Sequence, residues 1–160
     1  MGFAARIARG GKIGTGRFSV FGVRFSEEDG RRAMLARYKI YRGKRPAEDP
    51  LPDGLRKDTR KHTRHCLRPS AEAVAAYLAD PTEEAWEEFS RSYLSALEER
   101  FAEDRAPFDE LASAATEGDV YIGCNCPTQT NPDVDRCHTV LALQFMEERY
   151  GELEVCWPEK

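Results

Sequence analysis

The stretch from residue 118 to residue 150, GDVYIGCNCPTQTNPDVDRCHTVLALQFMEERY, constrains the fold more than any other part of the chain. Its run Val120–Ile122 is short and rich in β-formers, which is typical of a strand covered on both faces. A polar loop follows, and apolar residues then recur with helical spacing until near Gly151. In open α/β sheets, ligands bind beyond the carboxyl ends of the strands. The loop is therefore where we expect a functional site.

The start of the predicted helix holds several residues that cap helices or fit their first turn. Asn131 precedes Pro132, and Asp133 and Asp135 follow shortly after. Asparagine and aspartate side chains accept hydrogen bonds from the free N–H groups of a first turn, and proline is tolerated there. We therefore expect Asn131, Asp133 or Asp135 to cap this helix.

Further strands and helices are predicted along the chain. Strands are predicted at 18–25, 37–41, 119–123 and 153–157. Helices are predicted at 71–79, from just after Thr82, and at 108–115. A helical turn is predicted at 31–36 and a long loop at 42–58. Ser70 and Thr82 are expected to cap the first two of these helices. Strands that alternate with helices favour right-handed crossovers. The sequence thus predicts an α/β fold: a single three-layer domain over 18–160, with a mostly parallel sheet flanked by helices, after a flexible or irregular arm at 1–17.

The helix after Thr82 carries a stripe of large apolar side chains. Trp86, Phe89, Tyr93 and Leu97 are spaced by three, four and four residues. This spacing places the four side chains on one face of a helix. We interpret the stripe as hydrophobic core rather than as a ligand cage.

Composition favours a one-domain cytoplasmic protein without a membrane partner. The 160 residues suffice for one hydrophobic core, and no run approaches the length of a membrane span. The N-terminus has no apolar segment of signal-peptide length. Five cysteines without an export signal are expected to stay reduced. Composition does not specify an oligomeric state.

The net charge of −4 hides a division between the two halves of the chain. Residues 1–68 carry 18 Lys and Arg against 7 Asp and Glu, a net of +11, whereas residues 69–160 carry 6 against 21, a net of −15. The basic excess includes Thr59–Arg68, which contains Arg60, Arg64, His62 and His65. Guanidinium groups suit phosphate oxygens, so the basic half is a candidate for binding small anions or nucleic acid. The alternatives are a solvated basic surface and mutual neutralisation of the two halves.

Three of the five cysteines lie in the central loop, as Cys124, Cys126 and Cys137, and His138 follows them. Their thiolates are candidate metal ligands, with a histidine as the fourth, although the Cys-x-Cys spacing and the adjacent Cys137-His138 pair are unusual for structural zinc. A reactive thiol is a second hypothesis, with Cys137 and His138 as catalytic residues near a helix N-terminus. No basic residue follows Cys124 or Cys126 closely, which argues against phosphatase and rhodanese loops. Simple burial of small apolar thiols is the third interpretation.

A pocket for an anion needs no reactive thiol. Arg136 and His138 lie where the helix is expected to begin, and helix N-termini bind anions. The candidate ligand-binding residues are Arg60, Arg64, Cys124, Cys126 and Arg136. Our first hypothesis is therefore a small anionic or nucleotide-like ligand at the end of strand 119–123. A nucleic-acid or regulatory binding module and a metal-binding protein are the alternatives, and the residues specify neither a reaction nor a cofactor.

Several short motifs occur in a characteristic order. They are Leu67–Ser70, Asp80-Pro81, Trp86–Phe89 with Tyr93-Leu94 and Leu97, Phe108, Glu110–Ala112, Val120–Cys124, and Cys137-His138 leading into Leu141. Together they resemble the family named domain of unknown function 488 (DUF488) over about residues 67–150. Thr139 stands where that family commonly has an arginine, and the loop 125–136 is longer than usual. The resemblance implies an α/β fold and a bacterial or archaeal cytosolic protein, and it implies no established activity.

Overall fold

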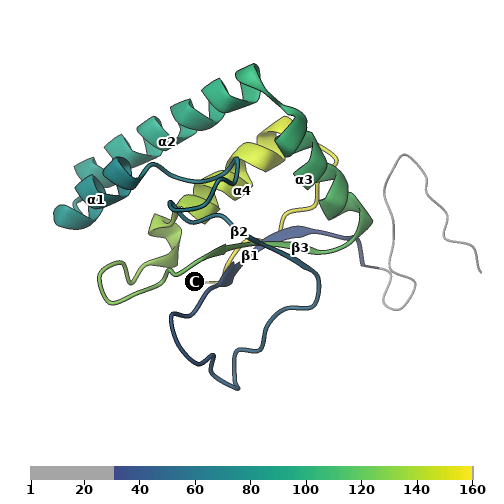
Figure 1. Ribbon diagram of the computed structural model, residues 1–160, viewed down its shortest axis with the longest axis horizontal. Helices are drawn as coiled ribbons and strands as arrows, with labels where there is room; N and C mark the ends of the chain where they lie inside the picture. Colours follow the sequence, from purple (N-terminus) through teal and green to yellow (C-terminus); the bar gives the residue numbers. More distant parts are fainter. Residues whose placement is uncertain (1–30, 160) are drawn as a thin grey trace, which may run out of the picture.

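The computed structural model describes residues 31–159, which form a three-stranded parallel sheet flanked by four α-helices (Figure 1). The strands are β1 (Leu35–Lys39), β2 (Leu55–Asp58) and β3 (Val120–Cys124), and the helices are α1 (Ala71–Ala79), α2 (Glu83–Glu103), α3 (Ala106–Glu117) and α4 (His138–Arg149), with a short 3-10 helix η1 (Val134–Arg136) before α4. The predicted α/β fold with a parallel sheet and flanking helices is confirmed. The predicted arm at 1–17 and strand at 18–25 lie outside the described residues, and the boundary at residue 18 stays a prediction.

Strand β3 is the centre of the sheet, because the strand order is β1-β3-β2 and both neighbours run parallel to it. Val120 and Ile122 are fully buried, as expected for a strand covered on both faces. Cys124 pairs with Lys39 of β1, and Gly123 pairs with Asp58 of β2. The carboxyl ends of all three strands therefore meet at one edge of the sheet.

Helix α4 lies between the sheet and α2, so it is buried on several sides (Figure 1). Seven of its twelve residues are buried, among them Leu143 and Met146, which have no exposed surface. Helix α1 packs beside α2, and α3 leads directly into β3. Within residues 31–159, no helix combines the length and the apolar character needed to cross a membrane.

The apolar stripe on α2 forms core, as predicted. Phe89, Tyr93 and Leu97 are buried, and Trp86 packs against the same cluster. The ring of Phe89 stacks on Trp86 and on Tyr93, with centroids 5.4 Å and 5.9 Å apart. Tyr93 also donates a hydrogen bond of 2.6 Å to the carbonyl of Leu67, which fixes the chain that enters α1.

Capping explains where α1 and α2 begin. The hydroxyls of Ser70 and Thr82 accept hydrogen bonds from backbone N–H groups three residues later, at 3.0 Å and 3.1 Å. The predicted caps of these two helices are confirmed. For α4 the prediction was wrong: Asp133 caps η1 instead, and Cys137 is the N-cap of α4 without a side-chain hydrogen bond.

Three local predictions are corrected by the structure. The segment 31–36 is not a helical turn, because β1 begins at Leu35 and pairs with β3. The predicted loop 42–58 contains β2 at its end. The predicted strand 153–157 reduces to a single bridge between Val155 and Leu35. In each case, pairing with a distant segment decides a structure that local sequence leaves open.

Candidate functional site

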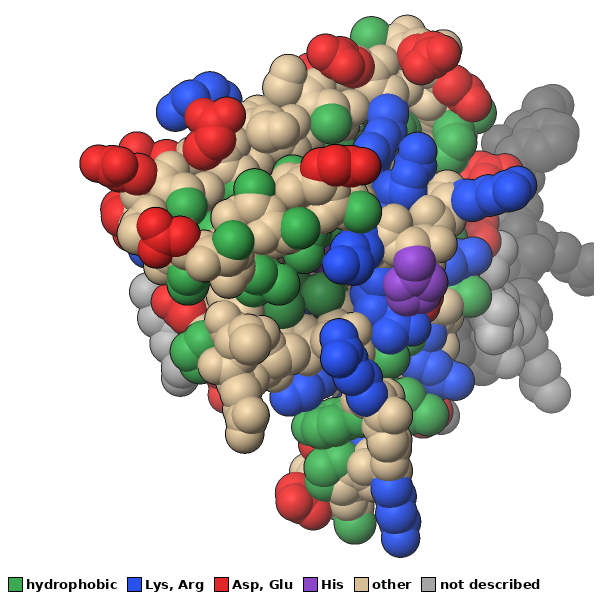
Figure 2. Space-filling view, turned by 60° about the vertical axis from the view of Figure 1, so that its left-hand side comes forward, with side chains coloured by type: hydrophobic (Ala, Val, Ile, Leu, Met, Phe, Trp, Pro, Cys, Tyr) green, Lys and Arg blue, Asp and Glu red, His purple; other side chains and the backbone are tan. Residues whose placement is uncertain are grey.

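A cavity of about 530 Å³ opens where the carboxyl ends of β2 and β3 meet the loop before α4. The parallel sheet dictates this position, since the strand ends share one edge. The space-filling view shows a hollow on this face, with Lys and Arg side chains gathered beside it and apolar side chains around it (Figure 2). Within residues 31–159, no Asp or Glu lines the cavity.

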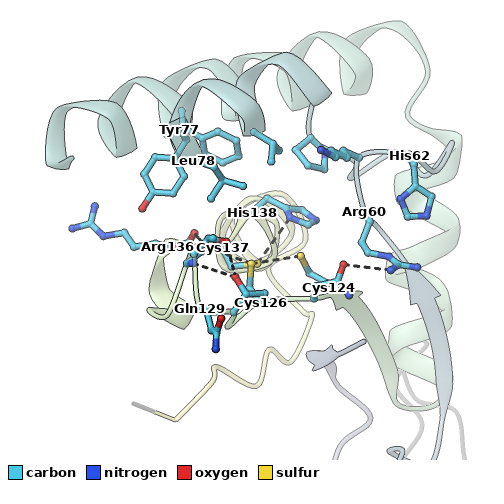
Figure 3. Close-up of a pocket in the computed structure, with 18 of the residues that line it drawn as sticks. Arg60, His62, Tyr77, Leu78, Cys124, Cys126, Gln129, Arg136, Cys137 and His138 are labelled. Carbon is cyan, nitrogen blue, oxygen red and sulfur yellow. Dashed lines mark hydrogen bonds between the residues drawn. The ribbon is translucent and has the colours of Figure 1, made fainter. Parts of the chain in front are cut away.

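Three thiols from separate positions of the chain meet in this cavity (Figure 3). Cys124 ends β3, Cys126 lies in the loop, and Cys137 precedes the first turn of α4. Their three sulfur atoms all lie within 4.8 Å of one another, and the Sγ atoms of Cys124 and Cys126 are 3.9 Å apart. All three cysteines are free thiols, and Cys124 and Cys137 are buried. The predicted clustering of these residues at the end of the strand is therefore present.

Two of the sulfur atoms receive hydrogen bonds from side chains of the same loop and helix. The amide of Asn131 donates to Sγ of Cys126 at 3.4 Å, and it also donates to the carbonyl of Arg136 at 2.8 Å. The hydroxyl of Thr139 donates to Sγ of Cys137 at 3.1 Å. These donors favour negative charge on the sulfur atoms.

Arg37 of β1 links both the loop and α4 to the sheet. Its Nε donates to the hydroxyl of Thr139 at 3.0 Å, and its second guanidinium nitrogen donates to the carbonyl of Cys126 at 2.6 Å. Lys39, two residues further along β1, donates to the carbonyl of Pro127 at 2.6 Å. Two cations on one face of β1 thus position the two sides of the thiol cluster.

Because the three thiols lie close together, their pKa values shift in different directions. Hydrogen bonds from Cys124 and Cys137, followed by one from Asn131, hold the pKa of Cys126 well below its ordinary value. The contact with Cys126 raises the pKa of Cys124, the contacts with Cys124 and Cys126 raise the pKa of Cys137, and burial raises both further. Because the three thiols interact, their protons leave in coupled steps that belong to the cluster rather than to one cysteine.

His138 is buried behind the thiols and stays neutral. Burial lowers its pKa to about 4. Its Nε2 lies 3.0 Å from the hydroxyl of Thr59, which itself donates to the carbonyl of Gly123 at 3.0 Å. Because that hydroxyl has one proton, Nε2 carries the ring proton and donates to it. Nδ1 then faces Sγ of Cys137 at 3.9 Å as an acceptor.

One wall of the cavity is basic. Arg60 lines it and forms an ion pair with Asp58 at 2.7 Å, which holds the pKa of that carboxyl below its usual value. Arg42 and Lys61 also line the cavity and have no ion-pair partner among residues 31–159. His62 stands beside them, with Nε2 3.8 Å from the Asp58 carboxylate.

The opposite wall is mainly apolar and comes from α1 and α2. Tyr77 and Leu78 of α1 face the thiols across the cavity (Figure 3). Phe89 of α2 also lines the cavity, and its ring packs against the ring of Tyr77, with centroids 6.0 Å apart. Leu78 keeps 38% of its surface exposed. The cavity thus combines a basic side, an apolar side and thiols.

The structure brings most, but not all, of the predicted site residues together. Arg60, His138 and the three thiols line one cavity. Arg136 lines it as well, but its guanidinium forms an ion pair with Glu83 and lies over the ring of Trp86, so it points away from the thiols (Figure 3). Arg64 is exposed and does not line the cavity.

Several residues of the site were missed from the sequence. They are Arg37, Arg42, Thr59 and Thr139, whereas Lys61 lies within the basic segment Thr59–Arg68 that the sequence indicated. Arg37 was detectable in principle, because alternation in the strand puts Arg37 and Lys39 on one face. The others carry no local signal, since a buried threonine or a cation in a turn is recognisable only once its distant partners are known.

A comparison with protein-family models assigns the chain to a family. The family model described as "Active DUF488-N3 subclade" matches residues 22–150. The chain belongs to the DUF488 family. The resemblance over residues 67–150 is thereby confirmed, and the match reaches further toward the N-terminus than expected. Comparisons with curated proteins and with solved structures found no match.

Proposed function

We propose that this DUF488 domain binds a small anionic ligand in the cavity beside the thiols. The observation that carries the proposal is that Arg42 and Lys61 line the cavity without an ion-pair partner among the described residues. Arg60 contributes less, because Asp58 already neutralises it. A basic wall with no lining carboxylate among the described residues favours an anion such as a phosphate group.

The shape of the cavity supports a ligand with an apolar or aromatic part. Tyr77 and Leu78 provide a surface on which a ring can pack while the anionic group lies against Arg42 and Lys61. A volume of about 530 Å³ is in the range of small-molecule sites. Nucleoside monophosphates combine such a ring with such an anion, whereas a nucleic-acid duplex is too wide to enter.

Binding of inorganic phosphate and of nucleoside monophosphates, measured by isothermal titration calorimetry, tests the proposal. Replacing both cavity cations, Arg42→Ala with Lys61→Ala, is expected to weaken binding at least about tenfold, because two charge-assisted contacts of about 1 kcal/mol each disappear. Arg64→Ala is the matched control, since Arg64 belongs to the same basic segment but lies outside the cavity.

Two outcomes would contradict the proposal. In one, Arg64→Ala weakens binding as much as the cavity variant. In the other, oligonucleotides bind with a steep dependence on salt while mononucleotides do not bind at all, which would favour a nucleic-acid surface over the cavity.

A further inference from the structure

We propose that Cys124, Cys126 and Cys137 hold one thiophilic metal ion, best matched by Zn²⁺, with a fourth coordination position that faces the cavity. This proposal does not depend on the anionic ligand. It starts from the three sulfur atoms, which lie within 4.8 Å of one another.

The sulfur spacing fits a single ion. A Zn–S bond of about 2.3 Å places two sulfur atoms of a tetrahedral site about 3.8 Å apart. The Sγ atoms of Cys124 and Cys126 are 3.9 Å apart, and the third sulfur lies within 4.8 Å of both. A cluster of several irons, with each thiolate on a different iron, requires more widely separated sulfur atoms. Ligands that are all thiolate exclude the hard cations Mg²⁺ and Ca²⁺, which prefer oxygen.

The surroundings of the sulfur atoms are those of a metal site. Metal ligands are commonly oriented by hydrogen bonds from a second layer of side chains. Asn131 donates to Sγ of Cys126, and Thr139 donates to Sγ of Cys137 while accepting from Arg37. Three thiolates around Zn²⁺ carry one net negative charge, which the Arg37 guanidinium is placed to offset. The thiol protons that the ion displaces leave to solvent.

The fourth position is open because His138 does not join the three sulfur atoms. Its Nε2 hydrogen-bonds with Thr59. Its Nδ1 lies 3.9 Å from Sγ of Cys137, but neither ring nitrogen lies within 4.8 Å of all three sulfur atoms. All three cysteines line the cavity, so an ion bound to them presents its remaining position to the cavity space. Zinc with three protein ligands and one exchangeable position is typical of catalytic sites, whereas structural zinc has four protein ligands.

Metal content is the first test. Protein purified anaerobically with a reductant is examined by elemental analysis and native mass spectrometry, and the chelated protein is titrated with Zn²⁺ against a competing chelator. We expect one ion per chain and a loss of affinity of at least about 100-fold in Cys126→Ser. Cys66→Ser and Cys156→Ser are the controls, because both thiols lie outside the cluster, and they should keep the ion. No uptake by the wild-type protein, or equal loss in the controls, overturns the proposal.

Co²⁺ substitution of the wild-type protein avoids variants that fail to fold. Thiolate-to-cobalt charge-transfer bands in the near ultraviolet and strong visible bands of tetrahedral cobalt are expected, and their absence overturns the site. X-ray absorption of the zinc form should give three sulfur ligands and one nitrogen or oxygen ligand. Added azide or inorganic phosphate should shift the visible cobalt bands. Four sulfur ligands, or bands that neither anion shifts, overturn the open fourth position.

The two proposals fail separately. Chelated protein is titrated with phosphate and nucleoside monophosphates, and the Arg42→Ala, Lys61→Ala variant is tested for Zn²⁺. Anion binding that depends on Arg42 and Lys61 in a chain that takes up no metal would overturn the metal site alone. Zinc uptake with no anion binding would overturn the anion site alone.

Discussion

Thr59 is the residue whose buried hydroxyl joins the end of β2 to α4. It has no exposed surface, and its hydroxyl lies between Nε2 of His138 and the carbonyl of Gly123, at 3.0 Å from each. Both neighbours are also buried. A buried polar group without a hydrogen-bond partner destabilises the fold. The Thr59 hydroxyl therefore stabilises it by giving partners to both the His138 ring and the Gly123 carbonyl.

Thr59→Val removes the hydroxyl but keeps the shape of the side chain. We expect a loss of about 1–3 kcal/mol in the free energy of unfolding, because the His138 Nε2–H then lacks an acceptor. Urea unfolding followed by circular dichroism measures this loss. Thr116→Val is the control, since the Thr116 hydroxyl only donates to the carbonyl of Ser113 at the surface of α3. A change in Thr59→Val no larger than in the control would show that the bridge does not stabilise the fold.

At the scale of the elements, the chain just before β2 lies very close to the start of β3. Gly54, just before β2, has a φ of 143°, which favours glycine. A Cβ atom at this position would lie 2.6 Å from the carbonyl oxygen of Asp119 and 3.0 Å from the Tyr121 ring. β2 has the sequence LRKD, which shows little apolar pattern. It forms a strand because its backbone hydrogen-bonds to one edge of β3.

Gly54→Ala is therefore expected to lower the free energy of unfolding by more than about 1 kcal/mol, through backbone strain and contact with Asp119. The midpoint of urea unfolding measures the effect. Gly43→Ala, in the same connection between β1 and β2, is the matched control, since a Cβ there meets no atom within 4 Å. An equal effect of the two substitutions would show that the close contact between position 54 and Asp119 does not affect the free energy of unfolding.

At the scale of the whole molecule, the pKa values of two carboxyl groups, those of Asp58 and Asp109, link stability to pH. Asp58 pairs with Arg60 beside the cavity, and Asp109 of α3 accepts a hydrogen bond of 2.6 Å from Tyr150, just after α4. Arg60 lowers the pKa of Asp58, and Tyr150, together with Arg105, lowers that of Asp109, each from an ordinary value of 3.8.

Acid should therefore weaken the fold. A carboxyl whose pKa is lower in the folded state contributes stability that is present above pH 3.8 and is lost as the pH falls through the folded-state pKa. We expect the thermal midpoint to fall between pH 5 and pH 2, and to fall less in Asp58→Asn and in Asp109→Asn. Asp53→Asn, at an exposed aspartate, is the control. A control that flattens the pH profile as much as the other two would contradict these assignments.

Local patterns in the sequence determined much of this protein. The hydroxyls of Ser70 and Thr82 define where α1 and α2 begin, the spacing of Phe89, Tyr93 and Leu97 defines the buried face of α2, and Val120–Ile122 defines the central strand. Such signals are readable because capping and periodicity involve residues only a few positions apart.

Tertiary structure alone decided what depends on distant partners. Pairing with β3 made Leu55–Asp58 a strand, and the ion pair with Glu83 turned Arg136 away from the thiols. The sequence placed three cysteines and a histidine in one loop, but the folded chain brought together the sulfur atoms and left the histidine bonded to Thr59. The physical reason is that side-chain direction at the end of a strand and the start of a helix is fixed by packing between elements, which spacing along the chain does not encode.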